Sequence, residues 1–547
     1  MQRVLEARWL PAAVFGVALL ARVAYLVQAR DHPLHEFVFA LIDSLYYHRH
    51  ALEVASGDFL HMSAFYLGPL YAYFMAALYA LTQPSPEIVR GAQALLGAFS
   101  CLLLFWVGER LYDRRVALLS GLLLAFYPLH LYYTGLLLPT ILVVFLNLLL
   151  LWLLLRQAEA PSLPGAALAG GVLGLAILAK SNALVLLPLF VAVWFWLQRS
   201  QALRQRALWC GVFSAVALAS VAPATLHNWV VSERFVLITT SGGRNLWKGN
   251  GSIANGTHPL GDAERSQGAL GRRLAGKVDP VAAAEEASEY VTRTLEHVRL
   301  HPGDVARVML LKFVLFWNAV ELGVRDQFYF AQHYASLLRL PLAFGWLAPL
   351  GLVGAVWSFR PRSPALFAQA MLAAQVFSFV AIFVLARYRL VAVACLILFA
   401  SWLLVHWLEA ARRADWRMLG LSAAAAAALA IFVNWPLAEF PRERGFALVY
   451  AKIGAMRLRA GEPRAAIEAY RQALDLDWQG YDEGEKRGEA LFEIARAQLE
   501  LGEREAAAVT LRRLLGETTP SEYVRERTTQ LLDELQAGRG ASSGPAP

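Results

Sequence analysis

Long uninterrupted runs of apolar residues constrain the fold of this chain more than any other feature. Runs such as Trp9–Val27, Leu136–Leu155 and Leu390–Leu408 have about the 17–25 residues that a membrane-spanning helix needs. These runs do not alternate in segments of about ten, which excludes an outer-membrane barrel. With 58% apolar and only 17% charged residues among 547, the chain is too apolar for a soluble enzyme. The sequence predicts an all-α, polytopic bundle of about 11–13 transmembrane helices.

Basic residues between the apolar runs predict the orientation of this bundle. Arginines such as Arg110 and Arg199 gather in every second short loop. Since Lys and Arg are enriched in short cytoplasmic loops, we expect a bacterial inner-membrane protein with a cytoplasmic N-terminus and an uncleaved first span. Two long hydrophilic loops, about 29–90 and 227–340, and everything after residue 435 then lie on the outer, periplasmic face. We expect function on that face, because the cytoplasmic loops are short.

The net charge of +8 does not indicate a nucleic-acid partner, because most Lys and Arg lie in the loops that orient the chain among inner-membrane lipids. The three cysteines lie inside apolar runs, so no disulfide or zinc site is expected. Five of the twelve histidines lie between His32 and His61. His48 and His50 are two residues apart and point to different faces of a helix, so we expect no metal.

The C-terminal part, residues 436–537, predicts a separate helical domain after the membrane domain of residues 1–435. Charged residues and alanine dominate it, and a pattern of small residues and leucines occurs twice, around Gly461 and Gly502. This pattern is typical of tetratricopeptide repeats, which bind partner proteins. A generic amphipathic hairpin is the alternative. Residues 538–547, rich in Gly, Ser, Ala and Pro, are expected to be disordered.

The first outer loop holds the first candidate for chemistry. Asp43 lies three and four residues before Tyr46 and Tyr47, so the three side chains share one face of a helix. We expect Tyr46 and Tyr47 to bind substrate there. A carboxylate beside the end of a span can accept a proton from a hydroxyl nucleophile. The alternative is an ordinary solvated acid.

Basic residues on the outer side form the second candidate. Lys180, Arg387 and Arg389 follow or precede apolar runs on the side where the orientation rule disfavours cations. A phosphate group held at the membrane surface explains them better than a soluble anion. Pairing with outer carboxylates such as Glu321 or Asp326 is the alternative.

The second outer loop contains a polar cluster that includes Arg244, Asn245, Lys248 and Asn250, with glycines and Trp247 between them. Amides and cations offer hydrogen bonds to hydroxyls or phosphate, and the aromatic ring offers a stacking face. The segment does not match a nucleotide P-loop, since no Gly-Lys-Ser/Thr ending follows.

Ordered motifs along the chain carry a family resemblance. In sequence they are Asp-x-x-Tyr-Tyr from Asp43, Pro-Leu-Tyr from Pro69, Gly-Glu-Arg-Leu-Tyr from Gly108, Tyr-Pro from Tyr127, Leu-x-Lys from Leu178, His-Asn from His227, Gly-Gly-x-Asn-Leu from Gly242, Gly-Asn from Gly249 and Arg-Tyr-Arg-Leu from Arg387. Roughly from residue 10 to residue 435, the chain resembles the C-type-fold integral-membrane glycosyltransferases. Within these it is similar to the superfamily of protein O-mannosyltransferases and lipid A aminoarabinose transferases, in versions with a tetratricopeptide tail.

The resemblance implies transfer of a sugar from a polyprenyl-phosphate donor to a hydroxyl of a protein, lipid or glycan acceptor on the outer face, with inversion and without a cofactor. It gives Asp43 the role of general base or acceptor-orienting group. It gives Arg387 and Arg389, and also Lys180, the role of binding the leaving phosphate.

One departure from the family pattern is visible. Many relatives carry a second acid in a segment that here reads Gly135-Leu-Leu-Leu-Pro-Thr-Ile, without a carboxylate. An unusual acceptor, substitution by Glu321 or loss of activity could each follow. The competing hypotheses are a catalytically silent scaffold that recruits envelope proteins through its tail, and a flippase or transporter of a lipid-linked sugar.

Overall fold

The structure is a computed structural model in which residues 7–32, 35, 42–59, 63–257, 280–323, 328–437, 445–478 and 483–541 are described. Within these ranges all regular elements are helices, which confirms the predicted all-α class. Asp326, considered above as a partner for the outer cations, lies outside the described residues.

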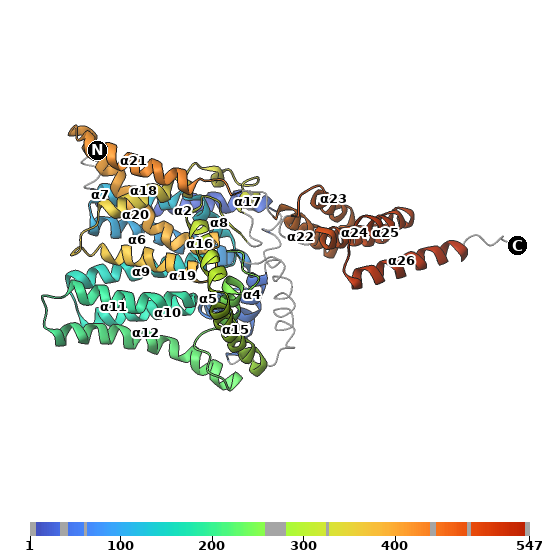
Figure 1. Cartoon of the computed structure of the whole chain (residues 1–547), viewed down its shortest axis with the longest axis horizontal. Coiled ribbons are helices and arrows are strands. Elements are labelled where there is room, and N and C mark those ends of the chain that lie inside the picture. Colours follow the sequence, from blue (N-terminus) through green and yellow to red (C-terminus); the bar gives the residue numbers. More distant parts are fainter. Residues whose placement is uncertain are drawn as a thin grey trace.

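The membrane part is a bundle of helices that lie side by side (Figure 1). Its members are α2 (Leu10–Gln28), α6 (Pro86–Leu111), α7 (Arg114–Ala125), α8 (Pro128–Gly135), α9 (Thr140–Glu159), α10 (Leu163–Ala179), α11 (Leu186–Leu197), α12 (Leu203–Ser232), α18 (Phe344–Trp357), α19 (Leu366–Ala381), α20 (Ala386–Arg412) and α21 (Trp416–Val433).

Six of the described helices are long and apolar enough to cross a membrane, namely α2, α6, α9, α12, α20 and α21. Helices α7 and α8, which meet at a bend of 49°, make a seventh if the pair is one span. Shorter apolar helices, among them α10, α18 and α19, lie beside them. The chain is therefore a multi-pass membrane protein. The 11–13 predicted spans exceed these six or seven because the prediction included the shorter helices as spans.

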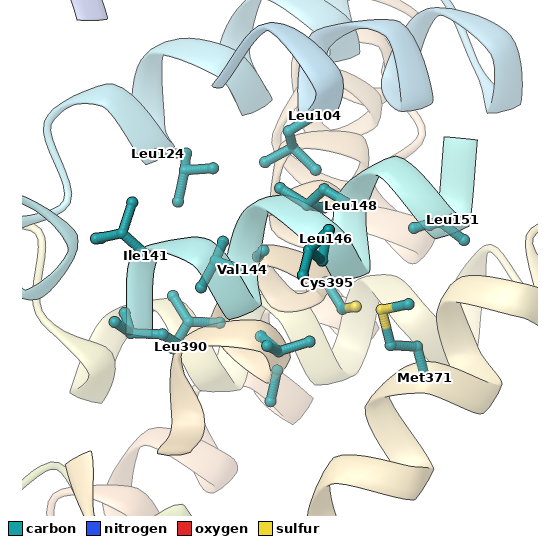
Figure 2. Packing of buried hydrophobic residues seen from close by; sticks show 14 of the residues in the cluster. Leu104, Leu124, Ile141, Val144, Leu146, Leu148, Leu151, Met371, Leu390 and Cys395 are labelled. Carbon is teal, nitrogen blue, oxygen red and sulfur yellow. The ribbon is translucent and has the colours of Figure 1, made fainter. Parts of the chain in front are cut away.

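Helix α20 lies at the centre of the bundle. In its most apolar window 83% of the residues are buried inside the protein, against 17% for α21 at the periphery. Figure 2 shows Leu390 and Cys395 of α20 beside Val144 of α9, with Met371 of α19 close by. A segment packed on all sides in this way is held in a fixed position, so its end is a rigid support for a site.

The elements that connect the spans at one end of the bundle are longer than those at the other end (Figure 1). They comprise η1 (Ala29–Asp31), α4 (Ile42–Ala55), α5 (Leu70–Leu81), η3 (Ser181–Val185), α13 (Ser241–Asn250), α15 (Pro280–Leu300), α16 (Pro302–Trp317), α17 (Phe328–Ala331) and η4 (Ser336–Arg339). We call this end the loop end. It corresponds to the two long hydrophilic loops of the sequence, and α2 begins at the opposite end (Figure 1).

The C-terminal part, which we call the tail, projects from the loop end (Figure 1). It consists of α22 (Phe446–Arg459), α23 (Pro463–Leu474), α24 (Glu483–Glu500), α25 (Arg504–Glu517) and α26 (Glu522–Ala541). Gly461 and Gly502, with φ of 76° and 79°, follow the ends of α22 and α24, where a left-handed residue ends a helix. The tail has its own apolar core. Helix α26 extends into the segment expected to be disordered, of which residues 542–547 lie outside the described ranges.

Close approach of α18 to α20 depends on a glycine. A Cβ at Gly354 would collide with the backbone oxygen of Phe399, whereas a Cβ at Gly420 of α21 would meet no atom within 4 Å. Small residues at helix contacts let backbones approach, which is how membrane helices gain packing energy.

We expect Gly354→Ala to lower the unfolding free energy by about 1–3 kcal/mol, because backbone atoms of the central helix must shift. Gly420→Ala adds the same methyl group to a peripheral helix and is the matched control. Thermal melting of both variants in detergent measures the effect. Equal melting temperatures would contradict the packing account.

Candidate active site

The centre of the loop end is an ion pair between two elements far apart in the sequence. Arg387 lies in the first turn of α20, and its Nη2 donates to Oδ2 of Asp43, in the first turn of α4, at 3.1 Å. The Asp43 side chain is 33% exposed and that of Arg387 is 16% exposed. Both groups therefore remain accessible to a substrate. The first turn of a helix such as α20 also favours an anion, because the helix dipole is positive there.

Lys180 joins this pair through an aromatic ring. Its ammonium lies 3.6 Å from the ring centroid of Tyr388, and the Arg387 guanidinium lies 5.2 Å from the same centroid. Lys180 directly follows α10, and a Cβ at Gly68 would lie 2.6 Å from the Leu178 oxygen. The segment before α5 thus packs tightly against the end of α10 that carries Lys180.

Arg389 is only two residues from Arg387 but has a different environment. Its side chain is 1% exposed, and its Nη atoms donate to the backbone oxygens of Phe316, Asn318 and Val320. Nη2 also donates to Oε2 of Glu321 at 2.5 Å. The Glu321 side chain is 8% exposed. This second ion pair is therefore buried, whereas the first is accessible.

Tyr46 and Tyr47 lie on α4 beside Asp43, as their spacing predicts. Tyr47 is 3% exposed, and its ring meets that of Tyr71 edge-on at 5.0 Å. Burial, with the nearby Asp43 carboxylate, raises the pKa of the Tyr47 hydroxyl well above its ordinary value. Tyr46 accepts a hydrogen bond from the backbone N–H of Tyr66 at 3.2 Å. Both rings therefore support the position of α4.

The polar cluster of the second loop folds as helix α13. Arg244 forms an ion pair with Glu286 of α15 and faces the ring of Tyr290 at 5.4 Å. Asn245 is half-buried, and Lys248 is buried.

The C-terminal end of α13 packs on the connection between α19 and α20. The Asn250 amide donates to the Ala381 oxygen at 2.9 Å, and Gly249 lies against the Ile382 oxygen so closely that a Cβ has no room. This connection leads directly into Arg387. The contacts of Asn250 are therefore those of a residue that holds the start of α20 in place.

Two residues of the loop end carry contacts that the motifs did not reveal. Tyr388, between the two arginines, lies under both site cations. Lys312 of α16 is fully buried and donates to Asn250 Oδ1 at 2.8 Å and to the Gly249 and Ile382 oxygens at 3.1 and 3.3 Å. A single lysine inside the apolar stretch Val305–Val320 was the signal in the sequence that could have found it.

The segment that lacks the expected second acid is held by backbone hydrogen bonds. Gln93 of α6 donates to the oxygens of Thr134 and Leu136, and Arg90 donates to the oxygen of Gly135. Leu136 is itself 8% exposed. Across the described residues, no group of three or more His, Cys, Asp or Glu side chains is arranged to hold a metal ion.

Comparison with known proteins supports a membrane glycosyltransferase. Residues 67–227 match the family described as dolichyl-phosphate-mannose-protein mannosyltransferase, a range that includes Lys180. No curated protein sequence matches the chain significantly.

Solved structures show a distant likeness. The oligosaccharyltransferase of Archaeoglobus fulgidus in its apo form is 15% identical with a TM-score of 0.46, over 85% of this chain and 60% of that chain. ArnT from Cupriavidus metallidurans bound to undecaprenyl phosphate is 16% identical with a TM-score of 0.42, over 94% and 82%. The chain thus spans about 60% of the length of the archaeal enzyme.

Lys312 gives the fold a pH dependence. Burial lowers the pKa of its ammonium from 10.5 to about 8. Between these values the unfolded chain holds a proton that the folded chain has released, so stability rises with pH and is lost as pH falls through about 8. We expect the melting temperature of the native protein to rise relative to that of Lys312→Met between about pH 7.5 and about pH 9.5. A difference between the two proteins that does not change with pH would contradict this.

Proposed function

We propose that this protein transfers a sugar from a polyprenyl-phosphate carrier to an acceptor hydroxyl at the loop end of the bundle, with inversion of the anomeric carbon. The observation that carries the proposal is the accessible Asp43 carboxylate beside Arg387, with Lys180 and Arg387 both against the Tyr388 ring. One acid and two cations at the end of a membrane bundle match the needs of a reaction between a hydroxyl and a lipid phosphate.

The proposed reaction is a direct displacement. Asp43 accepts the proton of the acceptor hydroxyl, whose oxygen forms a bond to the anomeric carbon. The bond between this carbon and the phosphate oxygen breaks, and polyprenyl phosphate leaves with the electron pair. The Arg387 guanidinium carries five N–H donors in a planar fork, a geometry that suits a phosphate as well as a carboxylate. Arg387 and Lys180 thereby stabilise the charge that develops on the leaving group.

Arg389 takes a different role in this proposal from the phosphate binding expected on the sequence. Its side chain is 1% exposed and already donates to carbonyl oxygens and to Glu321. Binding a phosphate would break these buried hydrogen bonds, at a cost of about 1–3 kcal/mol for each group left unpaired. We therefore assign Arg389 and Glu321 to positioning the first turn of α20. Glu321 is then a support for the site rather than a replacement for the missing acid.

The remaining residues divide in the same way. Arg244 and Asn245 are candidates for contacts to the sugar or the acceptor, and Tyr46 and Tyr47 position Asp43. Asn250, expected on the sequence to bind substrate, holds the connection before α20. Lys248, expected to do the same, is buried. We further propose that the loop end faces the periplasm, that the N-terminus is cytoplasmic, and that the tail is a tetratricopeptide domain for a protein partner.

The silent scaffold is the second candidate, and the absence of a carboxylate from residues 135–141 is the observation that favours it. A scaffold needs no accessible acid beside cations, whereas a transferase does. The assay that follows decides between them.

We expect the purified protein to release polyprenyl phosphate from polyprenyl-phosphate sugars when acceptor extracts are supplied. Asp43→Asn keeps the size and a hydrogen bond to Arg387 but cannot take the proton, so release should fall by about 10²–10⁴-fold. Glu289→Gln removes an exposed acid of α15 and should have no effect. No release by the native protein with mannose, glucose or aminoarabinose donors would favour the scaffold.

We expect Arg387→Gln to lower kcat on the order of 100-fold, because it removes a charge that acts on the leaving phosphate. Arg387→Lys keeps the charge and should recover part of the rate, since a lysine cannot contact Asp43 and phosphate in the same geometry. Arg234→Gln, an exposed arginine paired with Glu285, is the control. Equal rates for all three variants would remove Arg387 from the mechanism.

A further inference from the structure

The tail is joined to the loop end by an apolar contact of its own. Phe330 of α17 is 2% exposed and forms a cluster with residues of the tail. Its ring centroid lies 5.4 Å from that of Phe446 and 5.2 Å from that of Tyr450, both edge-on. The other tail members of the cluster are Val449, Ile453, Met456 and Ala469.

The same phenylalanine also contacts the membrane bundle. Its ring meets that of His32, which follows η1 at the end of α2, at 5.6 Å and edge-on. Phe330 therefore lies between the tail and the bundle, and α17 cannot shift without changing both contacts. Edge-to-face rings fix an orientation as well as a distance, which makes this contact more specific than aliphatic packing.

The residue before Phe330 extends the contact to the site. The backbone N–H of Glu321 donates to the Tyr329 hydroxyl at 2.8 Å. The partly buried Tyr329 packs against both the core of the bundle and the tail cluster. Helix α17 therefore holds one end of the segment 318–322 directly.

Segment 318–322 in turn holds the first turn of α20. The Ala386 N–H donates to the Leu322 oxygen at 2.8 Å, one residue before Arg387. The Arg389 guanidinium donates hydrogen bonds to the Asn318 and Val320 oxygens at 2.6 and 2.9 Å. The segment is thus a continuous series of hydrogen bonds from Tyr329 to the backbone that carries Arg387.

We infer that the tail is a positioning part of the active site. Helix α22 holds α17, α17 holds segment 318–322, and this segment sets the place of Arg387 opposite Asp43. Tyr329 and Phe330 are positioning residues that act without touching the substrate. This inference rests on the proposed transferase function for its rate effects, but the mechanical coupling is a property of the fold alone.

The test uses the full-length protein with Phe446→Ala, Tyr329→Phe and the conservative Phe446→Leu. We expect the first two to lower kcat for polyprenyl phosphate release about tenfold with KM for the donor changed less than about twofold, since they move a group that acts in the transition state. Amide hydrogen exchange in residues 316–323 should become faster, while exchange in α24 and α25 stays unchanged. Phe446→Leu keeps most of the apolar volume but not the ring, and should restore part of the protection.

Matched controls come from the same domain. Val509 of α25 and Tyr523 of α26 are 62% and 72% exposed. Val509→Ala and Tyr523→Ala should leave both kcat and exchange in residues 316–323 at the native level.

Two results would overturn the inference. One is native exchange in residues 316–323 for Phe446→Ala and Tyr329→Phe with α24 and α25 intact. The other is faster exchange throughout the tail in Phe446→Ala while Tyr329→Phe, which leaves the tail contacts unaltered, keeps native exchange and kcat. Absence of release by the native protein would refute the transferase function and leave the exchange result to decide the coupling.

Discussion

The buried guanidinium of Arg389 organises the loop end of this protein. A charge taken out of water is stable only if its donors are satisfied, so the chain around it must supply oxygens in a fixed arrangement. Residues 316–321 do this with three backbone oxygens and the Glu321 carboxylate. These hydrogen bonds hold the first turn of α20 against a loop from another part of the chain. The orientation of Arg387, which lies in the same turn, depends on them.

Buried cations that donate hydrogen bonds also occur in the bundle and elsewhere at the loop end. Arg22 of α2, fully buried, donates to the Ala18 oxygen and approaches Nδ1 of His130 at 2.7 Å. Lys312 donates to two backbone oxygens and an amide oxygen. In each case the donors of a buried cation contact oxygen or nitrogen acceptors of other segments. Such contacts are how polar groups are tolerated inside a membrane protein. These cations are buried, whereas the pair of Asp43 and Arg387 is accessible.

Much of the fold could be predicted, because hydropathy and periodicity are local properties. The all-α class, the multi-pass bundle, helix α4 with Asp43 at its start, and the glycines after α22 and α24 all follow from runs or spacings within a few tens of residues. The number of spans was less certain. Length and composition separate α20 from α10 only when the ends of each helix are known, and those ends depend on how neighbours pack.

The site was predictable only in part. Charged residues at the ends of apolar runs are visible in the sequence. This pattern placed Asp43, Lys180 and Arg387 at one end of the bundle. Tyr388 was missed because an aromatic residue beside charged ones resembles a packing residue. Lys312 was missed although a lysine in an apolar stretch is a signal. The sequence also did not reveal that Arg387 is accessible and Arg389 is buried. Two residues apart on a helix, their side chains point about 200° apart, and only the surroundings tell which direction is buried.

The sequence by itself determined that the chain spans a membrane as helices and that its chemistry-bearing residues gather at one end. In lipid a chain must satisfy its backbone groups within helices or a closed barrel, and long continuous apolar runs exclude the barrel, so hydropathy suffices for that conclusion. The tertiary structure decided which charges are accessible and which are buried in hydrogen bonds, and it joined the tail to the loop end through Phe330. Those outcomes depend on contacts between segments as distant as Asp43 and Arg387, and no local pattern encodes the burial that such contacts create.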